Sequence, residues 1–514
     1  MKTVIRKLIP TAATLFLTLA TILPAQKPNT PESRAAKGLE AARQNPLALR
    51  LWLHKMPKGA DLHIHLGGAI YAETFIRDAA EDNLCIDTTK LAFAAAAKSS
   101  QECSEGKVPA TKAFQDQHLY DELIDSFSMR SFVPTTGESA HDHFFDTFSK
   151  FGGTAQRHKG EWLDEVATRA AAQNEQYLEI METPDFSHTA LIARAAHWNN
   201  DFNSLREDLL GHGLRDDIAV ARAHFDQAEA VRREREHCGQ PEETPACKVE
   251  IRYLYQVLRG LPKEIVFAQT LLGFEVASAD PRVVGINFVM PEDGYVSMND
   301  YSLQMKMVAY LHATYPKIHI TLHAGELAPV LVPYEGLCCH IRQAVEVAQA
   351  ERIGHGVDVI FEDRPHELLR EMAAKHIMVE INLTSNDVIL GVSGKNHPFP
   401  IYRQFKVPVA LSTDDEGVSR IDLTNEYVRA TQTYNLTYAD LKQMVRTGLE
   451  HSFLPGESLW RTQDNFKQTN AACTGDALGN ENPTSRCADF LKSSEKAQQQ
   501  WELEQRFRKF EASF

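Results

Sequence analysis

The chain has 514 residues, of which 43% are hydrophobic and 24% charged, and its formal net charge at pH 7 is -15. This composition supports a large packed core, and the acidic balance argues against nucleic acid or an anionic membrane surface as a partner. Length alone allows two or three domains, but α/β barrels commonly run this long as one elaborated domain.

The first 25 residues have the pattern of a secretory signal peptide. Basic residues precede an apolar stretch over residues 8–23, and Ala25 offers a small residue for cleavage. An uncleaved anchor helix is the alternative. The stretch is shorter than the ~20 residues that span a bilayer and contains Pro10 and Pro24, so cleavage is favoured. We therefore expect a mature protein in the periplasm or the medium, without a membrane anchor.

The rest of the chain divides into three predicted parts. Residues 26–51 form a polar N-terminal extension with helix-forming alanines, and residues 52–463 form the main domain. Residues 464–514 form a C-terminal tail that is polar at first and then helical around Trp501 to Phe510. Within the main domain, residues 80–160 are predicted to be a long, mostly helical insertion after the first strand.

Short apolar runs alternate with helical stretches through the main domain. The predicted strands are one that Trp52 to Leu62 leads into, then Tyr177–Met181, Val249–Val257, Val283–Val289, Ile318–Leu322, one beginning at Arg352-Ile353, Ile377–Leu383 and Val407–Leu411. The predicted helices cover residues 161–176, 200–247, 299–315, 339–350 and 364–375, and two more begin at Leu423 and Tyr438. This alternation predicts an α/β fold, a (β/α)8 TIM-type barrel with the insertion and both terminal extensions outside it.

Eight cysteines suit an oxidising compartment. Three short-range pairs lie in polar, loop-like segments where disulfides are plausible, although sequence does not fix connectivity. These pairs are Cys85 with Cys103, Cys238 with Cys247, and Cys473 with Cys487. The adjacent Cys338 and Cys339 are expected to be buried thiols beside a helix start. The absence of a C-x-x-C motif removes zinc-ribbon, thioredoxin-like and cytidine-deaminase-type interpretations.

Polar groups suited to metal chemistry end four of the apolar runs. They lie in Asp61-Leu62-His63-Ile64-His65, His323-Ala324-Gly325-Glu326, Gly354-His355-Gly356 and Ser412-Thr413-Asp414-Asp415. The C-terminal ends of parallel strands meet at one face of a barrel, where such enzymes build their active sites. The four segments together indicate a mononuclear metal hydrolase.

Four of these side chains are candidate metal ligands. His63 and His65 are two residues apart on a strand, so both imidazoles face the same side. His323 adds a third nitrogen and Asp414 a carboxylate, a set that suits one Zn²⁺ with water in the open position. Two core histidines would be the structural alternative for the His63–His65 pair alone.

The remaining polar groups have candidate catalytic roles. Glu326 lies three residues after His323 and can donate a proton to a substrate ring nitrogen. His355, between two glycines, can act beside the metal water as a base or an electrostatic partner. Asp415 follows Asp414 and can share a hydrogen bond with another ring nitrogen.

These segments resemble the adenosine deaminase family of the amidohydrolase superfamily. The resemblance covers roughly residues 52–455 and includes Met56-Pro57-Lys58-Gly59 and Arg352-Ile353 before Gly354. With the signal peptide, the Met-Pro-Lys lead-in is similar to the secreted, growth-factor-like branch. The resemblance implies a small-molecule purine nucleoside as partner and leaves a homodimer open.

The family implies a role for each matched residue. His63, His65, His323 and Asp414 would bind zinc, in agreement with the reading of the residues themselves. Glu326 would protonate purine N1, His355 would orient the attacking hydroxide and Asp415 would contact N7. Hydroxide would attack C6 and ammonia would leave. Gly325 and Met290 are expected beside the substrate.

Two positions depart from the family pattern. An Asp that holds the ribose 5′ hydroxyl is replaced by Gly67, and a Gly whose backbone N–H meets purine N3 is replaced by Met290. The Met290 side chain is expected to crowd the site. Glu292 is either a replacement ribose contact or a solvated loop acid. Methylthioadenosine and AMP therefore remain alternative substrates; for AMP, Arg130 and Arg420 are the basic candidates.

Other functions and other histidines are weaker candidates. A binuclear amide or ester hydrolase would want a carboxylated Lys at a mid-barrel strand end, and none is in place; a decayed, non-enzymatic binding protein would be expected to lose a ligand. His141-Asp142-His143 lies in a phenylalanine-rich helix, where positions i and i+2 diverge, so a lid over the pocket is favoured over a metal site. His340 is expected to pack, and Lys395-Asn396-His397 is given no role.

Overall fold

The computed structural model describes residues 30–96 and 102–514. The predicted signal peptide over residues 1–25 lies outside the described residues. Eight parallel strands form one sheet in the order β1-β5-β6-β7-β8-β9-β10-β11. Their bounds are β1 Gly59–His65, β5 Glu175–Glu182, β6 Glu250–Leu258, β7 Val283–Val289, β8 His319–Ala324, β9 Arg352–His355, β10 Met378–Ile381 and β11 Val409–Leu411. The predicted strands and their order are confirmed, with ends shifted by a few residues.

The sheet closes into a barrel where its two edge strands meet. Ile64 of β1 forms a parallel bridge with Asp414, just beyond the end of β11. The Asp414 N–H donates to the His63 carbonyl at 2.8 Å, and the His65 N–H donates to the Asp414 carbonyl at 3.2 Å. The seam of the TIM-type barrel therefore runs through three of the predicted metal ligands.

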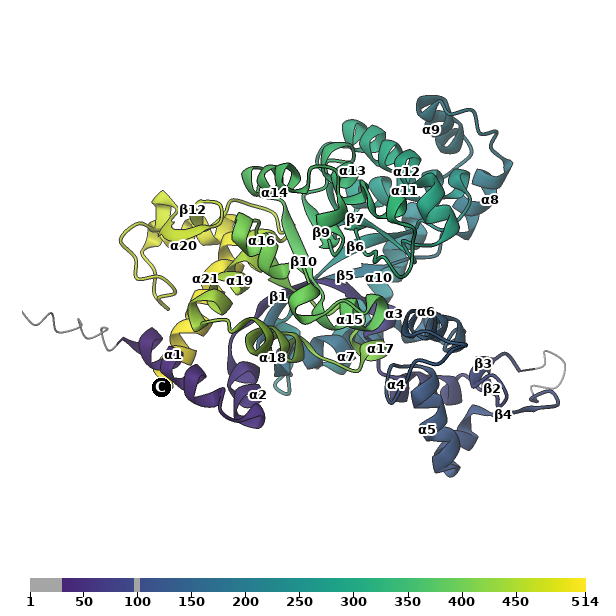
Figure 1. The fold of residues 1–514 in the computed structure, drawn as a ribbon, viewed down its shortest axis with the longest axis horizontal. Coiled ribbons are helices and arrows are strands. Elements are labelled where there is room, and N and C mark those ends of the chain that lie inside the picture. The colour runs from purple at the N-terminus through teal and green to yellow at the C-terminus, as the bar shows by residue number, and fades with distance from the viewer. Residues whose placement is uncertain (1–29, 97–101) are drawn as a thin grey trace, which may run out of the picture.

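Helices follow most of the strands and cover the barrel (Figure 1). They are α7 Ala155–Ala172, α8 Ser187–Ala195, α9 Phe202–Gly211, α10 Asp216–Arg235, α11 Lys263–Ala279, α12 Tyr295–Thr314, α13 His340–Glu346, α14 Pro365–Ala374, α15 Leu383–Leu390, α16 Phe399–Phe405, α17 Glu416–Ser419, α18 Leu423–Tyr434 and α19 Tyr438–Glu450. The helices predicted from Leu423 and Tyr438 begin at those residues. At both, an Asp or Thr at the preceding position accepts a hydrogen bond from a first-turn backbone N–H.

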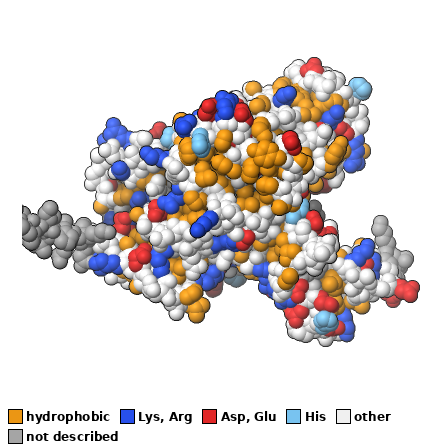
Figure 2. Space-filling view, viewed as in Figure 1, with side chains coloured by type: hydrophobic (Ala, Val, Ile, Leu, Met, Phe, Trp, Pro, Cys, Tyr) orange, Lys and Arg blue, Asp and Glu red, His pale blue; other side chains and the backbone are white. Residues whose placement is uncertain are grey.

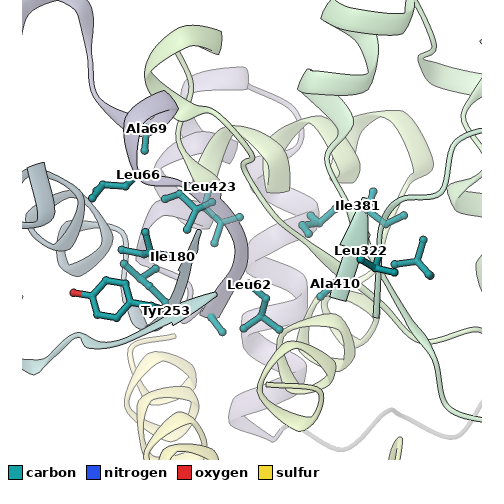
Figure 3. Packing of buried hydrophobic residues seen from close by; sticks show 14 of the residues in the cluster. Leu62, Leu66, Ala69, Ile180, Tyr253, Leu322, Ile381, Ala410 and Leu423 are labelled. Atoms are coloured by element: carbon teal, nitrogen blue, oxygen red, sulfur yellow. The ribbon is translucent and has the colours of Figure 1, made fainter. Parts of the chain in front are cut away.

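An apolar core of aliphatic side chains lies between the strands and the helices that cover them. Leu62, Ile180, Leu322 and Ile381 are at most 1% exposed, and Figure 3 draws them with residues of the covering helices. β5 and β8–β11 are buried along almost their whole length because helices cover their outer face.

The insertion after β1 differs from the prediction. It holds the helices α3 Leu66–Ala69, α4 Ala72–Glu81, α5 Gln117–Ser126 and α6 Ala140–Lys150, but also an antiparallel sheet. That sheet has the order β3-β2-β4, with β2 Cys85–Asp87, β3 Ala92–Ala94 and β4 Lys107–Pro109. These strands are three residues each, too short for an alternating pattern to be read from sequence. In Figure 1 the insertion forms a lobe at the lower right.

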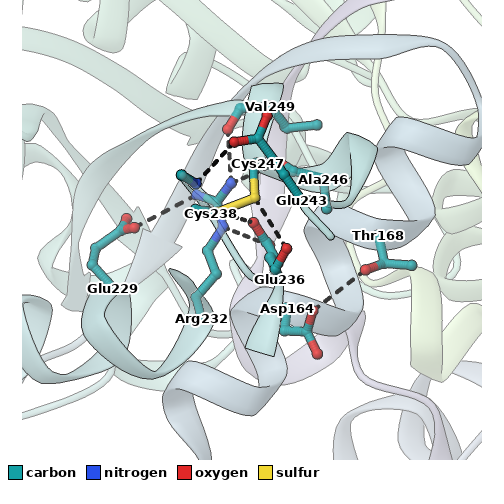
Figure 4. The surroundings of a disulfide bond; sticks show 11 residues. Asp164, Thr168, Glu229, Arg232, Glu236, Cys238, Glu243, Ala246, Cys247 and Val249 are labelled. Carbon is teal, nitrogen blue, oxygen red and sulfur yellow. Dashed lines mark hydrogen bonds and ion pairs between the residues drawn. A yellow bond between two sulfur atoms is a disulfide. The ribbon is translucent and has the colours of Figure 1, made fainter. Parts of the chain in front are cut away.

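The structure joins all eight cysteines in disulfides. The bonds are Cys85–Cys103, Cys238–Cys247, Cys473–Cys487 and Cys338–Cys339. The three short-range pairs are confirmed. The expectation of buried thiols at 338 and 339 is wrong, because these two half-buried residues bond to each other. Figure 4 shows the second bond beside Arg232, whose guanidinium donates to Glu236 at 2.8 Å.

The first and last described helices pack together on the barrel (left in Figure 1). α1 Pro31–Ala42 contacts α19 and the final helix α21 Glu495–Ala512, and Trp52 of α2 Pro46–Lys55 meets Tyr438 and Phe510 edge-on. A hairpin, β12 Trp460–Thr462 with β13 Asn465–Thr469, precedes α20 Ser485–Ser493. Within residues 30–96 and 102–514 we find no helix of the length and hydrophobicity needed to cross a membrane. On the face drawn in Figure 2, acidic and basic side chains are interspersed.

Candidate metal centre and active site

The four predicted metal ligands converge at the C-terminal mouth of the barrel. His63 and His65 end β1, His323 lies in β8 and Asp414 follows β11. The His323 Nε2 lies 3.1 Å from the Nε2 of His63 and 3.2 Å from that of His65. Asp414 Oδ1 lies 3.5 Å from His63 Nε2 and 3.2 Å from His65 Nε2. The structure thus brings together groups that are up to 351 positions apart in the sequence.

Each histidine ring is fixed through its other nitrogen. The Nδ1 contacts are His63 to Glu380 Oε2 at 2.6 Å, His65 to Gln256 Oε1 at 2.8 Å and His323 to Asn287 Oδ1 at 2.9 Å. An oxygen acceptor at Nδ1 holds the proton there and leaves the Nε2 lone pair free for a metal. Sequence reasoning missed these three partners, which come from β10, β6 and β7.

Asp414 has an unusual backbone conformation, and its side chain is oriented by the hydroxyl of Ser385. Its φ is +66°, in the left-handed region that non-glycine residues seldom adopt. Its Oδ2 accepts from Ser385 Oγ at 2.6 Å, so Oδ1 faces the imidazoles. Asp61 reinforces this end of the seam, because its Oδ2 accepts from the N–H and hydroxyl of Thr413 at 3.1 and 2.6 Å.

The donor set fits a tetrahedral metal ion. Zinc bonds to nitrogen and oxygen at about 2.0–2.1 Å, which separates neighbouring ligand atoms by roughly 3.3 Å. The separations of 3.1 to 3.5 Å bracket this value. Burial holds the pKa of His323 well below its usual range, so this ring is neutral and able to coordinate.

The buried carboxylate of Glu292 holds the loop that carries Glu326. Gly325 has a φ of +75°, and a Cβ there would lie 2.4 Å from Asp358 Oδ1, so the turn needs glycine. The N–H groups of Gly325 and Glu326 donate to the Glu292 carboxylate at 3.0 and 2.9 Å, and His340 Nδ1 lies 2.5 Å from it. The glycine turn and its hydrogen bonds to Glu292 together therefore fix the position of Glu326.

Both expectations for Glu292 are wrong. It is 1% exposed, so it is neither a solvated loop acid nor among the residues that line the cavity described below. Burial raises its pKa, but the hydrogen bond and charge of His340 outweigh burial and lower it to about 2. His340 packs as predicted, stacked on Tyr301 at 3.6 Å between ring centroids.

Glu326 and His355 lie together beside Asp414. Burial, reinforced by the charges of Asp414 and Glu292, raises the pKa of Glu326 well above its usual range. Its carboxyl can therefore carry a proton at neutral pH. His355 Nδ1 lies 3.5 Å from Glu326 Oε1, and burial lowers the pKa of His355 to about 3. A Cβ at Gly354 would lie 2.5 Å from the His63 ring, which explains the glycine before His355.

The Asp415 side chain packs against Gly68 of α3, the short helix that follows β1. Burial, with the charge of Asp414, raises its pKa to about 7. A Cβ at Gly68 would lie 1.5 Å from Asp415 Oδ1, whereas a Cβ at Gly67 would meet nothing within 4 Å. A side chain at position 68 would therefore displace Asp415, whereas one at position 67 would not.

Gly68→Ala is expected to displace the Asp415 carboxylate and to lower kcat/KM on the order of 10²-fold, the cost of a misplacement of about 1 Å. Gly211→Ala is the control, because a Cβ at Gly211 would meet nothing within 4 Å and the residue lies outside the cavity lining, and it should leave activity within about twofold. Steady-state kinetics with a melting curve for each variant checks this. Equal activity of the two variants would contradict the assigned place of Asp415.

A cavity of about 420 Å³ opens onto the metal centre. Its lining includes His65, Gly67, Gly68, Met181, Glu182, Thr183, Gln256, Leu258, Val289, Met290, Pro291, His323, Glu326, Ile389, Asp414 and Asp415. Phe144, Phe145 and Phe148 of α6 close one side, so the predicted lid role of this helix agrees with the structure. The volume is within the ~300–1,000 Å³ typical of small-molecule sites.

Met290 lines this cavity as expected. Its φ is +83°, the backbone conformation that favours glycine, and its side chain is 39% exposed. The Met290 Cε packs 2.9 Å from where a Cβ of Gly260 would lie, so the side chain leans over the neighbouring strand end.

The other histidines and arginines named from the sequence have partners of their own. His141 bonds to Asp293 at 3.2 Å and His143 to Glu138 at 2.9 Å, on different sides of α6. Arg130 pairs with Asp125 and Arg420 with Glu73, and neither arginine is among the cavity-lining residues. His397, given no role from sequence, is 2% exposed and bonds to Asn386 Oδ1 at 3.0 Å.

Comparison with known proteins places this geometry in a family. The sequence model of adenosine deaminase matches residues 161–468, more than half of the chain. The chain belongs to the adenosine deaminase family. His63 and His65 lie outside the matched stretch, and the barrel seam brings them to the matched His323 and Asp414.

Individual relatives align over shorter stretches. Adenosine deaminase of Clostridium perfringens is 33% identical over 139 residues, which cover 27% of this chain and 39% of that enzyme. The chain thus matches less than half the length of this curated relative. An N6-mAMP deaminase from arabidopsis has a TM-score of 0.51 at 20% identity, covering 79% of this chain and 96% of its own. A Burkholderia ambifaria amidohydrolase with bound Zn has a TM-score of 0.52 at 16% identity, covering 79% and 88%. Both structures support the barrel fold.

Proposed function

We propose that this member of the adenosine deaminase family is a zinc-dependent aminohydrolase of adenosine or a related 6-aminopurine nucleoside. One observation carries the proposal: three histidines with oxygen-bound Nδ1 atoms and one carboxylate converge on a cavity that the buried acids Glu326 and Asp415 also line. His63, His65, His323 and Asp414 would hold one zinc ion per chain.

The residues divide the work of hydrolysis. Zinc, when bound, supplies the Lewis acidity that makes a water nucleophilic near neutral pH. Glu326 donates its proton to a purine ring nitrogen while the water oxygen bonds to C6. The C6–N bond then breaks as C6 becomes a carbonyl: one proton of the water moves to the amino group, which leaves as ammonia, and the other returns to the Glu326 carboxylate. Asp415 holds a second ring nitrogen by a hydrogen bond, and His355 orients the water.

The cavity favours a neutral nucleoside. Among the described residues that line it, Lys159 is the one Lys or Arg, and its Nζ lies 2.8 Å from Glu182. A phosphate would therefore face a cation that is already neutralised. Glu182 and Thr183 offer oxygen groups for sugar hydroxyls in place of the Asp that Gly67 replaces. The phenylalanines of α6 offer apolar cover for the base.

A second candidate is a modified nucleoside or a nucleotide. The open space at Gly67 favours a substrate with a 5′ substituent, such as methylthioadenosine. The Arabidopsis neighbour is named as a deaminase of a methylated AMP, which keeps AMP among the compounds to test. The N-terminal sequence pattern supports the further proposal that the enzyme works in the periplasm or outside the cell.

Ultraviolet absorbance at the adenine-to-hypoxanthine difference band tests the proposal. The zinc-loaded protein is incubated with adenosine, 2′-deoxyadenosine, methylthioadenosine, AMP and adenine, with and without chelator. We expect chelator-sensitive turnover, with nucleosides faster than AMP. No turnover of any of these compounds by zinc-loaded protein would contradict the proposed function, and AMP as the fastest substrate would contradict the argument from Lys159.

A further inference from the structure

A chain of hydrogen bonds runs from a backbone N–H to the active-site His355. Phe399 N–H donates to His397 Nδ1 at 3.1 Å, and His397 Nε2 lies 3.0 Å from Asn386 Oδ1. Asn386 Nδ2 then lies 2.9 Å from His355 Nδ1. All four residues are at most 2% exposed, so bulk water does not compete for these contacts. α15 carries Asn386, and His397 precedes α16.

The Phe399 N–H sets the donor and acceptor at every hydrogen bond in this series. A backbone N–H can only donate, so His397 Nδ1 must accept and carries no proton. The neutral ring then has its proton on Nε2, which donates to Asn386 Oδ1. This fixes the Asn386 amide so that its Nδ2 donates to His355. His355 Nδ1 is therefore bare, and its proton is on Nε2.

The opposite direction fails at the backbone end. If His355 Nδ1–H donated to Asn386, the amide would turn over and His397 would carry its proton on Nδ1, against the Phe399 N–H. A doubly protonated His397 meets the same clash, and burial, with the charge of Arg429, lowers its pKa to about 3. Two other groups approach His355 Nδ1, Asn382 Nδ2 at 3.4 Å and Glu326 Oε1 at 3.5 Å, both farther than Asn386.

This series of hydrogen bonds leaves His355 Nε2 free on the side of the metal centre. His355 Nε2 is buried and has no hydrogen-bond partner among the described residues. Its nearest carboxylate oxygen is Asp414 Oδ2, at 4.0 Å, and its ring lies 5.0 Å from that of His323 between centroids. A donor N–H aimed into a cavity is suited to a ligand oxygen.

We propose that Asn386 and His397 are positioning residues that hold His355 as the Nε2–H tautomer, so that it donates a hydrogen bond to the attacking water rather than accepting its proton. This inference rests on the proposed function for the identity of that water. It decides between the two roles that the sequence left open for His355, base or electrostatic partner, in favour of the second.

Two pairs of variants test it. Asn386→Asp nearly preserves size, but a carboxylate can only accept, so it should move the His355 proton to Nδ1. His397→Leu removes the anchor, whereas His397→Gln keeps it, because a Gln amide can accept from Phe399 and donate to Asn386. We expect kcat to fall about 10- to 100-fold in Asn386→Asp and His397→Leu, with KM within about threefold, and to stay near wild type in His397→Gln.

The tautomer itself is read without turnover. The full chain is labelled with nitrogen-15 at histidine and loaded with zinc, and the His355 signals are assigned by their loss in His355→Gln. Wild type and His397→Gln should show a protonated Nε2 and a bare Nδ1, and Asn386→Asp the reverse.

A protonated Nδ1 in wild type, or wild-type kcat in both Asn386→Asp and His397→Leu, would overturn the inference. If Asn386→Asp does not fold, the His397 pair decides alone. Because the spectrum needs no substrate, inactivity toward every purine would refute the proposed function and leave the tautomer result standing.

Discussion

Asp414→Ala is expected to lose the bound metal and the deaminase activity together. Among the residues that the structure describes, Asp414 is the only carboxylate in the cluster with His63, His65 and His323, and its Oδ1 lies 3.2 Å from His65 Nε2. Without it, three neutral rings would face a divalent cation with no negative charge. Metal content by mass spectrometry and the absorbance assay measure the two losses. Turnover should fall by about 10³-fold or more, because the metal supplies several kcal/mol of transition-state stabilisation.

The control for this prediction is Asp363→Ala, an exposed aspartate on the loop before α14. It should keep wild-type metal content and activity. Chelator should lower the melting temperature of wild type and Asp363→Ala, because a metal that binds only the folded state stabilises it, and should leave that of Asp414→Ala unchanged. Full zinc occupancy in Asp414→Ala would refute the ligand set.

Glu326→Gln should keep zinc and fold but lose turnover by about 10²- to 10⁴-fold, the usual contribution of a general acid. Glutamine preserves the size of the side chain and removes only the proton that Glu326 donates. The buried contacts that hold the loop are made by the Glu326 backbone N–H to Glu292, so they survive the substitution. Single-turnover kinetics on zinc-loaded protein separates this loss from weaker binding.

Glu335→Gln is the matched control, since Glu335 is exposed in the short helix η3 Tyr334–Leu337, in the same connection between β8 and α13, and does not line the cavity. It should behave as wild type in every measurement. Near-normal turnover in Glu326→Gln would show that another group donates the proton, and Asp415 would then be the next residue to replace.

The sequence alone determined the barrel and the residue types of its mouth. Apolar runs of strand length alternate with helical stretches, and parallel strands must place their C-terminal ends together. Polar residues at the ends of such runs, His323 and Asp414 among them, therefore had to meet. The His63–His65 spacing likewise follows from the two-residue period of a strand. Helix starts at Leu423 and Tyr438 were readable because their capping residues are adjacent in sequence.

Only the tertiary structure decided which buried polar groups support these residues. Glu292 looked like a loop acid, because nothing near it in the sequence indicates that His340, 48 positions later, and the turn at Gly325 bury it. The Nδ1 partners of the metal-facing histidines and the hydrogen bonds from Phe399 to His355 likewise join residues that are far apart in the sequence. A polar side chain is buried only where distant partners satisfy it, and those partners are set by packing, which local sequence patterns do not encode.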